Sequence, residues 1–213
     1  MNTVSKTPRR RLTALKAIAL GLSVLLPATA QAAQISTVQT EVGPIITIVG
    51  EIIPGDDRKF DATLATYPNA RVVYMRSEGG EVSAALNIGI TINERQMRAV
   101  VQDGDYCLSA CALAWLGSPS RTLYSQSQVG FHAAWRTESG GTQEDGVGNA
   151  MIGHYIKSIG LPLEAVIFAT SASPTNLSYI PTQHSSWRGI DFIVEGVPQY
   201  ALHKYVSAPR NRY

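Results

Sequence analysis

Short apolar runs alternate with amphipathic stretches through the middle of this 213-residue chain. The runs are rich in β-branched residues, as buried strands are, and the stretches between them space apolar residues as helices do. Regular alternation of strand and helix favours right-handed βαβ crossovers and a largely parallel sheet, so we expect an α/β fold. The predicted strands are 44–52, 71–75, 97–101, 121–124 and 128–131, and the predicted helices are 60–67, 81–94 and one around Ser109.

The pattern changes in the later part of the chain. Residues 137–148 are polar and rich in glycine, which predicts a mobile loop. Helical spacing of apolar residues returns at 150–159 and 163–170. A short helical turn at 181–186 and a last strand at 191–194 complete the prediction.

The first 32 residues have the features of a secretory signal peptide. Five basic and no acidic residues precede the apolar stretch 17–26, and Ala30-Gln31-Ala32 matches a small-x-small cleavage site. We therefore expect cleavage after Ala32 and a periplasmic or secreted protein. Arg9-Arg10-Arg11 also suggests the twin-arginine route, but the residues after it favour the general route. The stretch is too short to span a bilayer comfortably, so an uncleaved signal is the only membrane contact that we expect.

Length and composition fit one globular domain, because 45% of the residues are apolar and only 16% are charged. We predict a loose N-terminal arm at 33–43, the domain at 44–200 and a solvated tail at 201–213. The chain has 18 basic and 16 acidic residues, net +2. Without residues 1–32, 13 basic and 16 acidic residues remain, net −3. A mildly acidic chain without a basic run is unsuited to nucleic acid, and no such partner is expected.

The two cysteines, Cys107 and Cys111, are four positions apart. On a helix their Cα atoms would lie about 6 Å apart, which allows a disulfide in an oxidising compartment. Two small buried thiols are the alternative. Two sulfurs without a matching Cys or His pair do not form a zinc site, and no G-x-G-x-x-G follows a strand, so neither a metal nor another cofactor is expected.

A serine, a histidine and a pair of glycines are the residue types that a serine hydrolase requires, and all three occur in this chain. Ser109 opens an apolar helix and His132 ends an apolar strand, as a nucleophile and its general base would, and Gly79-Gly80 before them offers backbone donors for an oxyanion. Each also has an ordinary structural interpretation: a helix cap, a buried histidine and a tight turn. Among the other histidines, His184 in a polar segment is the strongest rival base.

The order and spacing of these residues resemble the proteolytic subunit of Clp-type serine peptidases, in the crotonase-like superfamily. The resemblance covers roughly residues 46–191 and rests on the segments 75–80, Ser109-Ala110 and 130–132. It is closer still to small exported Clp-like proteins of bacteria that have a Cys-x-Ser-Ala-Cys segment. It implies a crotonase-like α/β fold, a peptide or protein substrate, Ser109 as nucleophile, His132 as base, and oxyanion donors from the backbone of Gly79 and Ala110.

The chain departs from the family pattern at two positions. Glu78 stands where the family usually has proline, and the interval from Asp191 places Asn176 where the family has the triad aspartate. An amide can orient the imidazole but cannot stabilise its charged form, and such a replacement can cost about 10⁴ in turnover. Alternatively Asp103, Asp105 or Asp191 supplies the carboxylate.

The sequence therefore predicts an exported serine hydrolase of the peptidase kind, with a Ser-His dyad or a Ser109–His132–Asn176 triad. The alternative is a protein that has kept the fold as a binding or assembly module with an impaired site. The resemblance implies homo-oligomers, although we find no clear counterpart of the segment that interlocks the family's rings, so a smaller assembly or a monomer stays open.

Overall fold

The computed structural model describes Met1 and residues 32–196. Its main sheet has six strands in the order β1-β2-β3-β4-β6-β13, of which β1 is antiparallel to β2 and the others run parallel. The predicted α/β class with a largely parallel sheet is thus confirmed. The strands are β1 (Gln34–Thr40), β2 (Gly43–Val49), β3 (Val72–Arg76), β4 (Arg98–Val101), β6 (Ser120–Tyr124) and β13 (Ile193–Glu195).

A second, three-stranded sheet has the order β10-β7-β5. Strands β5 (Tyr106–Leu108) and β7 (Gln128–Phe131) are parallel, and β10 (Ser178–Tyr179) is antiparallel to β7. Backbone hydrogen bonds from Ser77 to Tyr106 and from Leu108 to Ser77 connect the end of β3 to β5. Two short hairpins complete the strands: β8 (Trp135–Glu138) with β9 (Gly141–Glu144), and β11 (Ser186–Trp187) with β12 (Ile190–Asp191).

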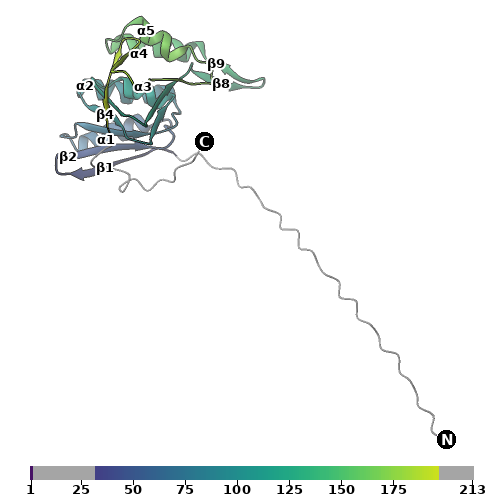
Figure 1. Ribbon diagram of the computed structural model, residues 1–213, viewed down its shortest axis with the longest axis horizontal. Coiled ribbons are helices and arrows are strands. Elements are labelled where there is room, and N and C mark those ends of the chain that lie inside the picture. The colour runs from purple at the N-terminus through teal and green to yellow at the C-terminus, as the bar shows by residue number, and fades with distance from the viewer. Residues whose placement is uncertain (2–31, 197–213) are drawn as a thin grey trace.

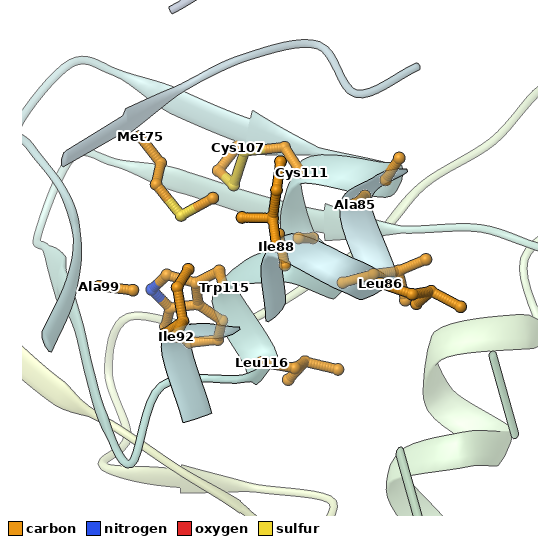
Figure 2. Close-up of a cluster of buried hydrophobic side chains, with 14 of the residues drawn as sticks. Met75, Ala85, Leu86, Ile88, Ile92, Ala99, Cys107, Cys111, Trp115 and Leu116 are labelled. Atoms are coloured by element: carbon orange, nitrogen blue, oxygen red, sulfur yellow. A yellow bond between two sulfur atoms is a disulfide. The ribbon is translucent and has the colours of Figure 1, made fainter. Parts of the chain in front are cut away.

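Figure 1 shows α2 and α3 between the main sheet and the pair α4–α5, with the β8–β9 hairpin projecting from the body. Helix α3 is buried along its whole length. Its Trp115 belongs to the apolar cluster in Figure 2 and donates its indole N–H to Thr122 O at 3.3 Å. The helices are α1 (Asp56–Thr66), α2 (Val82–Glu94), α3 (Ala110–Leu116), α4 (Gly146–Ser158) and α5 (Leu163–Thr170).

Two segments predicted to be irregular are regular instead. The expected loose arm at 33–43 contains β1, an edge strand whose backbone pairs with β2 from Gln34↔Val49 to Thr40↔Gly43. The expected loop at 137–148 contains most of the β8–β9 hairpin and the start of α4. Hydrophobic periodicity misses such segments, because every residue of β8 and β9 is exposed and β1 is mostly exposed or half-buried.

The expected tail at 201–213 and the predicted signal peptide lie outside the described residues, except for Met1 and Ala32 at the two ends of the latter. In the stretch 32–196, no helix combines the length and the apolarity that a membrane crossing requires.

Candidate active site

Ser109 lies at a sharp turn between the end of β5 and the first residue of α3. Its backbone has φ 54° and ψ −124°, a region that costs a non-glycine residue about 1–3 kcal/mol. The side chain does not cap α3, so its hydroxyl is not used by the helix. A serine on a strained turn between a strand and a helix is the arrangement of a nucleophile elbow, which exposes the hydroxyl.

His132 is held at the same edge of the second sheet. Leu108 of β5 is in register with Gly130 of β7, and the Ser109 N–H donates to Gly130 O at 2.8 Å. Because parallel neighbours lie about 4.8 Å apart and end at the same edge, the residues that follow β5 and β7 come together. The structure therefore brings the predicted nucleophile and the predicted base to one place.

Ser109 and His132 line a common pocket of about 380 Å³. Its wall is apolar on the side of α3 and α4, and two carboxylates, Glu51 and Glu78, also line it. The sequence did not point to Glu51 as a pocket residue. The lining residues are Glu51, Glu78, Gly80, Val82, Ser109, Ala110, Leu113, His132, Ala134, Trp135 and Ile152.

The imidazole of His132 is oriented by the backbone of the next residue. Nδ1 lies 2.7 Å from Ala133 O. A carbonyl oxygen only accepts, so Nδ1 carries the proton and Nε2 of the neutral ring holds the lone pair. Within residues 32–196 no hydrogen bond engages Nε2, which leaves it available as a base.

Asn176 does not take the place of a triad member. The antiparallel register Ser178↔Phe131 places Asn176 close to the level of Ala133, but its Nδ2 donates to Ser173 Oγ at 2.9 Å. The expected hydrogen bond from His132 to Asn176 is not formed, and Asn176 does not line the pocket. The Ala133 carbonyl, a group that every residue carries and that sequence patterns therefore cannot flag, orients the ring instead.

The structure favours Gly80 over Gly79 for the oxyanion-donor role that the sequence assigned to Gly79. The Gly79 N–H is already bound to Ser77 Oγ at 3.0 Å. In the described part of the chain the backbone N–H groups of Gly80 and Ala110 donate no hydrogen bond, and both residues line the pocket. Ala110 thus keeps its expected place, while Gly80 replaces Gly79 as the second candidate oxyanion donor.

Gly79 serves the elbow through its lack of a side chain. Its φ is +109°, and a Cβ there would lie 2.7 Å from Leu108 O and from Ser109 Cβ, and 2.9 Å from Ala110 N. Only glycine lets this backbone approach Ser109 so closely.

The rival residues lie elsewhere. His184 packs against Trp187, with ring centroids 5.6 Å apart. Asp105 is buried, with a carboxylate oxygen 3.9 Å from a guanidinium nitrogen of Arg76. None of the candidate acids lines the pocket: Asp103, Asp105 and Asp191.

Cys107 and Cys111 form a disulfide, with Cα atoms 5.1 Å apart. The expectation that both lie on one helix is wrong, because Cys107 belongs to β5 and only Cys111 to α3. In the range 32–196 no group of three His, Cys, Asp or Glu side chains is placed to hold a metal ion.

No protein-family model matches the chain, and no curated protein matches it in sequence. Solved structures do resemble it. A serine-to-alanine mutant of the 1510-N membrane-bound stomatin-specific protease is 18% identical, with a TM-score of 0.53 over 74% of this chain and 80% of that one. ClpP1 from Listeria monocytogenes is 18% identical, with a TM-score of 0.51 over 71% and 91% of the two chains. An asparagine-to-aspartate mutant of that ClpP1 is 14% identical, with a TM-score of 0.50 over the same shares. At such low identity the likeness concerns the fold alone, and it shows that this chain has a Clp protease-like α/β fold.

Proposed function

We propose that this chain is an exported serine hydrolase that cleaves peptide bonds, with Ser109 as the nucleophile and His132 as the general base. One observation carries the proposal: an uncapped serine on a strained elbow shares a pocket with a histidine whose Nε2 is available. A structural serine at a helix start would instead have relaxed backbone and a hydroxyl bonded to the helix.

In the proposed reaction His132 Nε2 takes the proton of Ser109 Oγ as the oxygen attacks the substrate carbonyl carbon. The N–H groups of Gly80 and Ala110 hold the resulting oxyanion. The imidazolium then gives its proton to the leaving amine as the carbon–nitrogen bond breaks. Water, deprotonated by His132, attacks the acyl group and releases Ser109.

The environment of His132 predicts slow turnover. The Ala133 carbonyl fixes the tautomer of the ring, but it offers a dipole in place of the full negative charge of a triad carboxylate. In serine triads, loss of that charge can cost about 10⁴ in turnover. The proposed enzyme therefore forms an acyl-enzyme more slowly than a complete triad does.

A peptide substrate is favoured by the fold and by the pocket. The similar structures include one whose name is that of a protease, and the pocket wall offers apolar side chains, among them Leu113 and Ile152, against which a substrate side chain can pack. Pockets that bind small molecules or side chains are commonly of this size and lining. An ester is the alternative substrate, and cleavage of a peptide library by the wild type would decide for a peptide.

Labelling with a serine-directed fluorophosphonate tests the proposal. We expect the purified, folded protein to be labelled on Ser109, identified by mass spectrometry, and Ser109→Ala to be inert. The His132→Ala variant should be labelled at least 100-fold more slowly, because general base catalysis contributes about 10²–10⁴. No labelling of the folded wild type would defeat the hydrolase and favour the binding or assembly module.

Export is part of the proposal and has its own test. Residues 1–32 have the sequence of a signal peptide, and a disulfide suits an oxidising compartment. In cell fractions of the native host we expect the protein outside the cytoplasm, with Ala33 at its N-terminus in mass spectra. An intact N-terminus on cytoplasmic protein would contradict it.

We also propose that copies of the chain associate. Apolar side chains are exposed at one end of the molecule on α4 and α5: Val147 is 69% exposed and Leu163 is 63% exposed, with Met151 and Ile167 beside them in the same helices. Light scattering should give a molar mass in solution above that of a single chain. The double variant Met151→Glu with Ile167→Glu should have a lower molar mass than the wild type. A monomer at micromolar concentration would refute this part alone.

A further inference from the structure

The Cys107–Cys111 disulfide encloses the nucleophile. Cys107 lies in β5 and Cys111 in the first turn of α3, so the bond spans the elbow with Ser109 at its centre. Both cysteines are fully buried. Figure 2 shows the bond inside the apolar cluster that also holds Met75 and Ile88. The elbow is therefore tied to the core from both sides.

Such a small ring acts mainly on local structure. A disulfide stabilises a fold largely by removing freedom from the unfolded chain, and this gain is smaller for shorter loops. Here the ring contains only residues 107–111. Its clearest effect is to restrict the backbone between the two sulfurs, which is the backbone of the elbow.

Ser109 has a less strained alternative conformation. A serine before a helix ordinarily has negative φ, and its hydroxyl accepts the N–H of the second or third helical residue, here Cys111 or Ala112. Ser109 instead has φ 54° and makes no such bond. A change to the capping conformation would turn Oγ toward the helix and away from His132.

We propose that the disulfide is the positioning element that keeps Ser109 in the elbow conformation, so that the hydrolase acylates faster when the bond is formed than when it is reduced. This inference rests on the proposed function. In the reduction a dithiol or a phosphine supplies two electrons, the S–S bond breaks, and each sulfur takes up one proton to give two thiols. The dithiol becomes a disulfide, or the phosphine takes an oxygen from water and becomes its oxide.

The test compares the two redox states of the full chain. We measure fluorophosphonate labelling at several probe concentrations, which separates the acylation rate from the apparent dissociation constant of the probe. Reduction by a phosphine, verified by two alkylated thiols in the mass spectrum, should lower the acylation rate at least tenfold and change the dissociation constant less than threefold. Reoxidation should restore the rate.

Two variants separate positioning from general stability. The double variant Cys107→Ala with Cys111→Ala should be labelled at the rate of the reduced wild type, and addition of the phosphine should not change that rate. Leu64→Ala, which opens a cavity in α1 outside the pocket, should lower the melting temperature but label at the wild-type rate while folded. A merely stabilising disulfide predicts that all these proteins label alike below their melting temperatures.

Each result decides the inference. Two free thiols with an unchanged acylation rate would overturn it and leave the proposed function intact. No labelling of the oxidised, folded chain would overturn both. If the double variant does not fold, the reduced wild type, with its fold checked by circular dichroism, provides the same comparison.

Discussion

Ser109 differs from an ordinary helix-capping serine in its backbone. The φ of 54° directs the side chain to the pocket, and Gly79 lies against the turn that produces it. His132 gains its orientation from a main-chain carbonyl. At the scale of single residues, a backbone carbonyl therefore orients the imidazole of His132, as a carboxylate side chain does in a complete triad.

The first prediction concerns Asn176. Because its amide bonds Ser173 and does not reach His132, Asn176→Ala should change the fluorophosphonate labelling rate less than threefold. Loss of a true triad member costs orders of magnitude. A drop of 100-fold or more in the labelling rate would show that Asn176 does orient the imidazole.

The second prediction concerns Gly79. A Cβ at this position would press on Leu108 O and Ala110 N, so Gly79→Ala should abolish labelling and destabilise the fold by about 1–3 kcal/mol. Gly43→Ala is the matched control, since Gly43 also has a positive φ, +110°, but nothing lies within 4 Å of its added Cβ. It should lose some stability and label normally. Equal labelling of the two variants would argue against the close approach at the elbow.

At the scale of elements, helix α3 is positioned by close contact with α2. A Cβ on Gly117, at the end of α3, would lie 2.1 Å from the backbone oxygen of Gly89 in α2. Tyr155 of α4 approaches the same place and donates its hydroxyl to Leu113 O at 2.9 Å. Small residues thus let three helices meet behind the pocket.

The third prediction follows from this contact. Gly117→Ala should destabilise the protein by about 1–3 kcal/mol, because the Cβ meets backbone that cannot move aside. Gly153→Ala in α4 is the control: its nearest neighbour would lie 3.5 Å away, and removal of a mid-helix glycine should stabilise by about 0.5–1 kcal/mol. Urea unfolding of both variants measures the difference, and a shift of the same sign in both would contradict the packing argument.

At the scale of the whole molecule, a cluster of polar side chains connects the last strand, β13, to the rest of the main sheet. Glu195 of β13 bonds Arg98 of β4, and it accepts the hydroxyl of Tyr124 in β6 at 2.7 Å. Burial, followed by the hydrogen bond and charge of Glu195, raises the pKa of Tyr124 to about 12. The fold therefore favours the protonated phenol.

The fourth prediction is an alkaline loss of stability. Since the folded pKa of Tyr124 lies above the ordinary value near 10, its contribution is complete below pH 10 and is lost as the pH rises toward 12. Tyr124→Phe lacks this hydrogen bond, so it should be less stable than wild type at pH 8, with a gap that narrows above pH 10. Urea midpoints from pH 8 to 11.5 measure the gap, and a constant gap would refute the linkage.

The sequence by itself determined the elements with a one-sided or fully apolar pattern. The predicted helix at 81–94 is α2, Val82–Glu94, and the predicted strand at 128–131 is β7, because burial on a fixed face leaves a period in the residues. The parallel sheet followed from their alternation. The choice of Ser109 and His132 followed from residue types at the ends of such elements and from the resemblance to a family.

Only the tertiary structure decided which groups surround that pair. The hydrogen bond from His132 to Ala133 O and the free N–H of Gly80 belong to the backbone, which is the same at every residue and leaves no mark in a sequence. The disulfide across the elbow depended on where β5 ends and α3 begins. Contacts between distant segments are set by strand register and helix packing, and a local pattern of residues does not contain them.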